Sequence, residues 1–521
     1  MSQLFSDPQF AAALARLPDY LSQHILVSAT ALALGLLISL PLALLATRRP
    51  ALRWALLTAA SVVQTIPGLA LLALFYPLLL GVSGLTARLF GAEFSALGFL
   101  PSVLALALYS VLPILRNTVT SILGIDPALQ QAARGVGMTP RQSLFMVELP
   151  LAMPVIMAGI RTSAVWVIGT ATLSTPVGQT SLGNYIFTGL QTQNWVFVLF
   201  GCVAAAVLAL VVDQLLALME RGVAMRKRAR VIVPGLALVV LMLAAFLPGF
   251  GHSRASYVIG AKPFGEQYIL AALIERRLTA AGLSATGREG LGSSIIFNAL
   301  AAGDIDAYVD YSGTIFANFM GRSDIQPRAQ TLREVTDWLM REHKIAMLGE
   351  LGFENAYALA MPRQRAAALG IASIADLARH APNLSIAGDY EFFGRPEWVA
   401  IREAYGLRFR QERQMQAEFM YPAAGNEVDV IAAYSSDGRI TRYNLLVLAD
   451  PKNAIPPYDA ILLVSPKRAG DEMLAAALRP LIGAIDVETM RAANLRAETD
   501  GSPQAAAAWI WAEIQRRQAP R

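Results

Sequence analysis

The chain has 521 residues, of which 55% are hydrophobic and 16% are charged, and its formal net charge is +5. Because a soluble globular protein carries about 25% charged residues, this composition predicts membrane-spanning segments. The small positive charge is not gathered into one long stripe, which excludes nucleic acid as the expected partner.

The first half of the chain contains six apolar stretches, each a candidate for a membrane span of about 20 residues. They cover residues 25–46, 54–87, 94–115, 151–174, 195–212 and 231–250. Pro67, Gly68 and Pro77 interrupt the second stretch, which predicts one span followed by a bent or re-entrant tail.

Basic residues gather in three places, 48–53, 116–141 and 226–230. Positive residues favour the cytoplasmic side of a membrane, and six spans put all three clusters there. The N-terminus and everything after about residue 251 are then expected outside. Arg161 lies in the fourth span, where a charge is either functional or snorkels, and its closeness to the cytoplasmic end favours snorkelling.

After residue 257 no apolar run is long enough to span a membrane, and short strand-like runs alternate with helical patterns. This alternation is typical of an α/β fold, and about 265 residues allow two lobes. We therefore expect an all-α polytopic membrane domain in residues 1–225, a sixth span and linker in 226–256, and an extracytoplasmic α/β domain in 257–521.

A cytoplasmic loop carries the sequence QQAARGVGMTPRQSLFMVELPLAMPVIMAGIR, residues 130–161. It resembles the ATPase-coupling loop of bacterial ABC importer permeases, in which two helices flank a turn. The positions that match the family pattern are Gln131, Ala132, Ala133, Gly137, Leu149 and Pro150. Gln131 replaces the usual glutamate, which weakens an ionic contact but leaves the shape. The resemblance implies an ABC ATPase partner at loop 126–150; the alternative is an ordinary amphipathic loop.

The segment STPVGQTSLGNYIFTGLQTQNW, residues 174–195, resembles the matching region of permeases for glycine betaine, choline and related osmolytes. It is either a polar external loop or a broken helix that lines the solute path. The chain contains no Gly-x-x-x-x-Gly-Lys pattern and no Gly-Lys dipeptide. Any ATP is therefore expected to be hydrolysed by a separate subunit, and the chain is expected not to be an enzyme.

Six motifs in the α/β part resemble the substrate-binding proteins of osmoprotectant importers. These are VIGAKPFGEQYILA (258–271), DIDAYVDYSGTIF (304–316), GFENAYALAM (352–361), YEFFGRPEW (390–398), AYSSDGRI (433–440) and PPYDAILLVSP (456–466). The resemblance extends over nearly all of 257–515. It implies the bilobed periplasmic-binding-protein fold, with lobe one in 257–357 and 460–515, lobe two in 360–458, and closure about a hinge when ligand binds.

A trimethylammonium head has no hydrogen to donate and is best held by aromatic faces. The resemblance implies a cage of four tyrosines, with further residues for a ligand carboxylate and one pocket-side glutamine. Carried over by motif, the cage is Tyr311, Tyr357, Tyr434 and Tyr458, the carboxylate partners are Lys262, Thr314 and Arg395, and the glutamine is Gln267. Tyr443 lies close to Tyr434 and could replace it. The family's Glu-Tyr-Thr-Gly-Thr reads Asp310-Tyr311-Ser312-Gly313-Thr314 here, which leaves the ligand's identity open.

These resemblances imply the fused permease and substrate-binding subunit of an ATP-driven importer in a bacterial inner membrane, working as a homodimer. The solute is expected to be glycine betaine, choline, carnitine or similar; Lys262 and Arg395 favour a zwitterion. The alternatives are another trimethylammonium compound such as ergothioneine, and a ligand-gated channel or sensory receptor. No enzyme-like cluster stands out. One cysteine, Cys202, and four scattered histidines favour neither a disulfide nor a metal or cofactor site; the histidines are His24, His252, His343 and His380.

Overall fold

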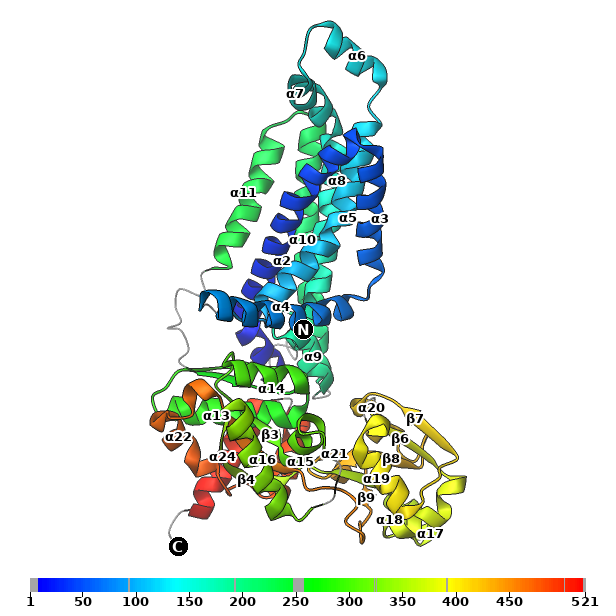
Figure 1. The fold of residues 1–521 in the computed structure, drawn as a ribbon, viewed down its shortest axis with the longest axis vertical. Helices are drawn as coiled ribbons and strands as arrows, with labels where there is room; N and C mark the ends of the chain where they lie inside the picture. The colour runs from blue at the N-terminus through cyan, green and yellow to red at the C-terminus, as the bar shows by residue number, and fades with distance from the viewer. Residues whose placement is uncertain are drawn as a thin grey trace. The chain divides into compact units, whose positions relative to one another are not determined.

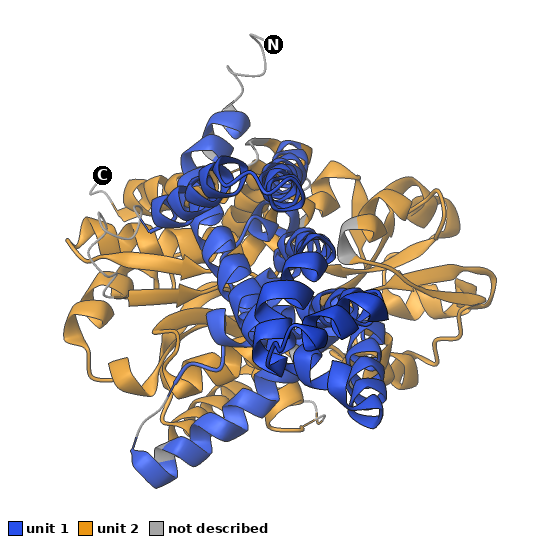
Figure 2. Ribbon diagram, turned by 90° about the horizontal axis from the view of Figure 1, so that it is seen from above, with its two compact units in different colours: residues 1–187, 196–253 blue, residues 188–195, 254–521 orange. Residues whose placement is uncertain are grey.

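The computed structural model describes residues 8–91, 94–191, 194–246, 257–322, 324, 326–389, 392–500 and 502–518. The chain forms two compact units, which Figure 2 distinguishes by colour. The helical unit comprises residues 1–187 and 196–253, and the α/β unit comprises 188–195 and 254–521. The predicted fold class, an all-α membrane domain followed by an α/β domain, is confirmed, and the α/β domain contains two sheets.

The helical unit is built from ten α-helices and two irregular turns among its described residues, counting α9, which crosses the boundary. They are α2 (Pro8–Arg48), α3 (Pro50–Thr65), α4 (Gly68–Phe90), α5 (Phe99–Leu123), α6 (Pro127–Gly135), α7 (Pro140–Ser143), a π-helical turn (Leu144–Glu148), α8 (Leu149–Ala171), a 3₁₀ turn (Thr172–Val177), α9 (Gly183–Gln191), α10 (Trp195–Ala224) and α11 (Ala229–Ala244).

Five helical segments in the described part of the chain are long and apolar enough to cross a membrane, in α2, α4, α5, α8 with its flanking turns, and α10. The sixth predicted span corresponds to α11, which has 16 residues. At 1.5 Å per residue such a helix is about 24 Å long, somewhat shorter than the roughly 30 Å apolar core of a bilayer. Residues 247–250, which complete the predicted span, and the linker 251–256 lie outside the described residues.

The second apolar stretch is divided into α3 and α4, as its prolines predict. Ile66, the residue before Pro67, is extended (φ −73°, ψ 128°), which is the conformation that a following proline favours. Figure 1 shows α4 lying across the direction of α2, α5, α8 and α10. The stretch therefore contains one helix along the bundle and one bent away from it, although α4 by itself has the length and composition of a span.

Close packing of α5 against α8 depends on a small residue, as is common between membrane helices. A Cβ atom on Gly159 of α8 would lie 2.9 Å from the Pro113 carbonyl oxygen of α5, so a larger residue would force the helices apart.

Arg161 of α8 reaches sideways to α10 rather than along its own helix. Its guanidinium forms two hydrogen bonds with Asp213, the Nη2–Oδ2 distance being 2.9 Å, and its Nη1 lies 3.6 Å from a carboxylate oxygen of Glu220. The expected snorkelling is thus replaced by an ion pair between two helices, which offsets the cost of a charge in an apolar segment.

The α/β unit contains two five-stranded mixed sheets. The first has the order β2-β1-β3-β10-β4 and consists of β1 (Tyr257–Gly260), β2 (Ala285–Arg288), β3 (Ala307–Tyr311), β4 (Ala346–Glu354) and β10 (Asp459–Val464). The second has the order β7-β6-β8-β5-β9 and consists of β5 (Tyr357–Pro362), β6 (Ser385–Gly388), β7 (Gln411–Gln414), β8 (Val430–Tyr434) and β9 (Leu445–Val447).

Helices accompany both sheets. They are α13 (Gly265–Ala280), α14 (Ser293–Ala302), α15 (Ser312–Thr314) with a π-helical turn (Ile315–Phe319), α16 (Arg328–His343), α17 (Arg363–Leu369), α18 (Ile374–His380), α19 (Pro396–Tyr405), α20 (Ala417–Ala423), α21 (Arg439–Arg442), α22 (Glu472–Leu478), α23 (Val487–Asp500) and α24 (Pro503–Gln518), with short 3₁₀ turns at 381–383, 392–394, 466–468 and 479–481.

The chain passes between the two sheets twice. It leaves the first sheet after β4 and enters β5 three residues later, and it returns between β9 and β10. β10 then pairs antiparallel with both β3 and β4, and every residue of β3 and β10 is buried. Strands that are buried along their whole length are typical of the centre of a sheet. Both crossings end next to predicted tyrosines, Tyr357 and Tyr458, so the topology brings distant motifs together.

Candidate functional site

The four predicted cage tyrosines all stand at strand ends. Tyr311 is the last residue of β3, Tyr357 the first of β5, Tyr434 the last of β8, and Tyr458 directly precedes β10. Tyr357 and Tyr434 are register partners across β5 and β8, and their ring centroids are 5.0 Å apart. The Tyr458 ring meets that of Tyr357 edge-on at 6.2 Å. Three of the four rings therefore form one cluster, called here the tyrosine cluster.

Tyr311 adjoins this cluster through the backbone. It pairs with Ala460 across β3 and β10, and Gly313 lies beneath the ring of Tyr458. A Cβ atom at Gly313 would lie 2.6 Å from that ring, so the absence of a side chain at Gly313 lets the ring pack on the main chain.

Two phenylalanines that the motif comparison did not single out join the tyrosines. The Phe392 ring lies 5.2 Å from that of Tyr357, and the Phe264 ring stacks 6.2 Å from that of Tyr311. Both occur inside the quoted motifs, 390–398 and 258–271, so an aromatic count of the motifs would have found them. Residues 390–391 of the first of these motifs lie outside the described residues.

The choice between Tyr434 and Tyr443 is informed by the ring packing. Tyr434 packs against Tyr357, whereas Tyr443 follows α21 with the Arg442 guanidinium 5.8 Å from its ring centroid. Tyr434 is thus the member of this pair that belongs to the tyrosine cluster.

Arg395 lies against the tyrosine cluster. Its guanidinium carbon is 5.4 Å from the centroid of the Tyr357 ring, and its Nη1 is 3.9 Å from a carboxylate oxygen of Glu397. A cation at this distance from an aromatic face is attracted by the ring quadrupole. The aromatic surface therefore already accommodates a positive group.

Lys262 differs from Arg395 because its charge is matched by a buried carboxylate. Its ammonium pairs with Asp310, and the two side chains are only 3% and 0% exposed. Asp310 also accepts hydrogen bonds from the Tyr308 hydroxyl (2.5 Å) and the Tyr311 amide (2.7 Å). Lys262 could reach a ligand carboxylate only by sharing its ammonium with Asp310.

Gln267 and Thr314, two of the predicted site residues, are both buried. The Gln267 amide nitrogen donates to the Tyr311 hydroxyl oxygen at 3.1 Å, so Gln267 orients this phenol. Thr314 ends the short helix α15 that follows β3.

Three of the predicted cage tyrosines donate a hydroxyl hydrogen bond to a carboxylate. The motif comparison assigned no role to these carboxylates. Tyr311 donates to Glu266 at 2.5 Å, Tyr434 donates to Asp389, and Tyr458 donates to Glu397. Burial, reinforced by the Glu266 carboxylate, raises the pKa of Tyr311 well above 10, so this phenol stays protonated.

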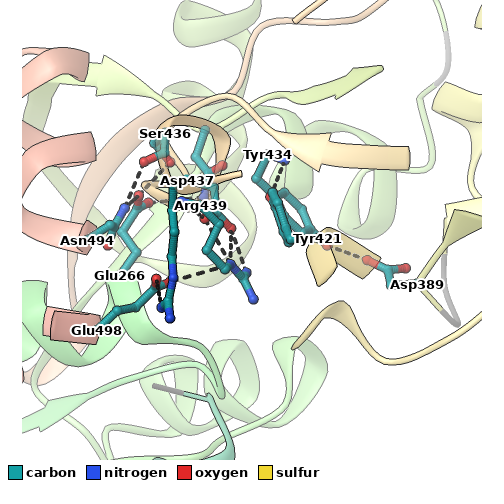
Figure 3. Close-up of polar contacts among 11 residues, drawn as sticks. Glu266, Asp389, Tyr421, Tyr434, Ser436, Asp437, Arg439, Asn494 and Glu498 are labelled. Atoms are coloured by element: carbon teal, nitrogen blue, oxygen red, sulfur yellow. Dashed lines mark hydrogen bonds and ion pairs between the residues drawn. The ribbon is translucent and has the colours of Figure 1, made fainter. Parts of the chain in front are cut away.

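Glu266, in the first turn of α13, accepts several hydrogen bonds, and Figure 3 shows it beside two of the donors, Ser436 and Asn494. Besides Tyr311, its two oxygens accept from the Ser436 hydroxyl (2.5 Å), the Asn494 amide (3.0 Å) and the Asn355 amide (3.1 Å). Burial raises the pKa of this carboxyl, whereas the hydroxyl and amide donors favour its ionised form. The network ties the loop after β8 to α13 and α23.

A second group in Figure 3 fastens the same loop to α23. Arg439 donates to Asp437 (2.6 Å), lies 3.5 Å from Glu498 of α23, and places its guanidinium 4.1 Å from the ring centroid of Tyr421. Burial raises the pKa of Glu498 to about 7. The segment after β8, which follows Tyr434, is therefore held by contacts with residues far away in the sequence.

The predicted coupling loop forms two short helices joined by a turn, at one end of the helical unit in Figure 1. Asp126 caps α6 by accepting from the Ala128 amide (2.9 Å), and Thr139 and Gln142 cap α7 reciprocally. Gly137 has φ +80°, a conformation that a side chain disfavours.

The matched positions of this loop differ in exposure. Gln131 and Ala132 are exposed on α6 and Ala133 is buried; Leu149 and Pro150 begin α8. Val136, in the turn, is 74% exposed, and Phe145 is 65% exposed. An exposed apolar turn between capped helices is a surface suited to docking on a partner.

The segment 174–195 is a broken helix rather than an exposed polar loop. A 3₁₀ turn ends at Gly178 in the left-handed conformation, and α9 begins at Gly183. Asn184 accepts from the Ser181 amide (2.8 Å) and the Thr175 hydroxyl (3.2 Å), and all three side chains are buried. Residues 192–193 lie outside the described residues.

Two family models match the chain. Residues 35–225 match the inner membrane component of binding-protein-dependent transport systems, and residues 255–513 match the substrate-binding domain of ABC-type glycine betaine transport systems. The choline transport system permease protein OpuBB of Bacillus subtilis is 42% identical over 199 residues, which are 38% of this chain and 84% of that protein. The chain belongs to the binding-protein-dependent transport permeases. This permease carries its substrate-binding domain in the same polypeptide.

A relative with both parts is the ergothioneine transport permease/ergothioneine binding protein EgtU of Helicobacter pylori, which is 27% identical over 463 residues, or 85% of this chain and 80% of that protein. Among solved structures, this permease is similar to that of a glycine betaine/carnitine/choline ABC transporter. The match covers 50% of this chain and 99% of that chain, with 26% sequence identity and a TM-score of 0.46. The matched regions are a membrane component and a substrate-binding domain, which makes this chain a subunit of an ABC importer whose family implies a separate ATPase.

Proposed function

We propose that this permease imports a solute with a quaternary ammonium head. The observation that supports this is the tyrosine cluster, on which the Arg395 guanidinium already lies 5.4 Å from the Tyr357 centroid. Aromatic faces attract a cation that has no hydrogen to donate, with about 0.5–2 kcal/mol per contact. Two relatives are named for the transport of compounds with such a head, choline for OpuBB and ergothioneine for EgtU.

The proposed binding site keeps the predicted residues and assigns their roles. The rings of Tyr311, Tyr357, Tyr434 and Tyr458 surround the ammonium head, Arg395, Lys262 and Thr314 serve a carboxylate, and Gln267 orients Tyr311. The proposed lobes are 257–357 with 460–515, and 360–458. In support, each lobe contains one of the two sheets, apart from two strand ends, residues 357–359 of β5 and Asp459 of β10.

ATP-driven transport needs a route from the binding domain to the ATPase. We infer that residues after about 251 lie outside a bacterial inner membrane, and that loop 126–150 binds a separate ABC ATPase on the cytoplasmic side. The exposed, capped helix–turn–helix supports this docking role. A pair of such subunits, as a homodimer with two ATPases, would enclose the solute path in residues 1–225 with the span in 226–256.

Binding measurements on the purified full-length protein test the proposal. Calorimetry with glycine betaine, choline, carnitine and ergothioneine should give a ligand, and Tyr357→Ala should weaken its binding about tenfold or more, the value of one good cation–π contact. Equal affinity for glycine and glycine betaine would refute the aromatic site. Ergothioneine is a specific second candidate for the solute, because the relative EgtU matches both units of the chain.

A further inference from the structure

Three of the four predicted cage tyrosines share a feature that the motifs do not reveal. Their hydroxyls donate to carboxylates from three different segments: Glu266 from α13, Asp389 from the loop after β6, and Glu397 from α19. Tyr311 and Tyr458 are buried and Tyr434 is half-buried, so these are not exposed surface contacts. The ring faces and the anions behind them therefore form a repeated arrangement.

Each carboxylate is held in place by contacts besides its tyrosine. Glu266 accepts from Ser436, Asn494 and Asn355. Asp389 accepts from the Phe392 amide at 2.8 Å. Glu397 lies in the first turn of α19, where the positive end of the helix dipole favours an anion.

We propose that Glu266, Asp389 and Glu397 determine the specificity of the site for a cation, by accepting hydrogen bonds from the hydroxyls of Tyr311, Tyr434 and Tyr458. This inference rests on the proposed function and deepens it. A phenol that donates to an anion gains electron density, which makes its ring face a stronger partner for a cation. The carboxylates also add direct attraction in a site of low dielectric.

The charges around the cluster fit this role. Lys262 is matched by Asp310, so this pair contributes little net charge. Among the described residues, the Arg395 guanidinium lies near one of the three tyrosine-bound carboxylates, 3.9 Å from Glu397. Acidic side chains therefore outnumber basic ones around these tyrosines in the described part of the chain, as a site for a cationic head requires. A neutral solute of equal shape gains nothing from this excess.

The test compares ligands that differ only in charge. Binding of choline and of its uncharged carbon analogue 3,3-dimethylbutan-1-ol is measured by calorimetry on the full-length protein, together with glycine betaine and 3,3-dimethylbutanoate. The wild type should prefer the ammonium member of each pair. Asp389→Asn and Glu397→Gln should each reduce this preference about fivefold or more, mainly by weakening the ammonium compound.

A matched control is Tyr257→Phe, which removes a hydroxyl that donates to Asp471 at 2.9 Å in the same unit, at the first residue of β1. It should leave both preferences unchanged. If a carboxylate variant fails to fold, Tyr434→Phe keeps the ring and removes only the donor, and it should lower the same preference.

Unchanged preference in the carboxylate variants and in Tyr434→Phe would overturn the role of the carboxylates while leaving the proposed function intact. A wild type that binds neither ammonium compound nor ergothioneine would overturn the proposed function, and the inference with it. If a carboxylate variant weakens binding of the ammonium compound and of its carbon analogue equally, the carboxylates only hold the rings in position, which also contradicts the proposal.

Discussion

Glu266→Gln is the most informative single change, because one buried carboxylate accepts four donors. Its two oxygens accept hydrogen bonds from Tyr311, Ser436, Asn494 and Asn355. Glutamine keeps one oxygen and turns an NH₂ group toward two of these donors. Hydrogen bonds to a charged group contribute about 1.5–3 kcal/mol each, so the loss of two costs about 3–6 kcal/mol.

Part of this loss is offset, because the neutral glutamine avoids the desolvation cost of a buried charge. The same burial raises the pKa of Glu266 in the wild type. We expect a net destabilisation of about 3 kcal/mol, or about 6–12 °C in Tm for a domain of this size. Ser436→Ala removes a single donor and should cost roughly half as much. Glu412→Gln, at an exposed position of β7, is the control and should stay near wild type.

The assay is thermal unfolding of the full-length protein, followed by hydrogen exchange in peptides from α23. These peptides contain Asn494 and Glu498 and report on the α/β unit alone. A Glu266→Gln protein within about 2 °C of wild type would refute the reasoning, because four buried donors would then have lost their ionic acceptor at no cost.

Three further outcomes are expected. Val136→Asp puts a charge on an exposed apolar turn residue and should reduce ATPase recovery in a pull-down about tenfold or more; undiminished recovery would contradict docking at this loop. Asp213→Asn leaves Arg161 without its main carboxylate and should lower the thermal stability of the helical unit in detergent. The double variant Arg161→Met with Asp213→Met should recover that stability. Equal stability of Asp213→Asn and wild type would mean that the ion pair is dispensable. Burial raises the pKa of Glu498 to about 7. Between about pH 4.5 and 7 the folded protein therefore keeps a proton that the unfolded chain releases, so the contribution of Glu498 to the free energy of unfolding falls as pH rises through this window. The Tm of Glu498→Gln minus that of wild type should therefore increase across this window; a constant difference would show that Glu498 does not titrate there.

Local patterns in the sequence were sufficient for the architecture. Uncharged stretches indicate spans because each charged residue in a bilayer adds its own free-energy cost, whatever its neighbours are. The alternation of strands and helices after residue 257 indicated the α/β fold, and the order of the motifs indicated the binding domain. The break at Pro67 could also be read locally, because proline removes a backbone donor and restricts the residue before it.

The tertiary structure decided which side chains meet. Tyr357 and Tyr434 share a cluster because β5 and β8 pair in that register, and a shift by one residue would turn one ring to the opposite face. The partner of Arg161 is 52 residues away, and the direction of α4 is invisible in its composition.

The tyrosine-bound carboxylates show the same division most sharply. Glu266 stands in a motif that was recognisable from the sequence, yet its role depends on Ser436 and Asn494, which lie 170 and 228 residues away. Hydropathy and motif spacing describe neighbours along the chain. A buried hydrogen-bond network depends on neighbours in space, and for this permease only the folded chain brings the predicted cage tyrosines and their carboxylates together.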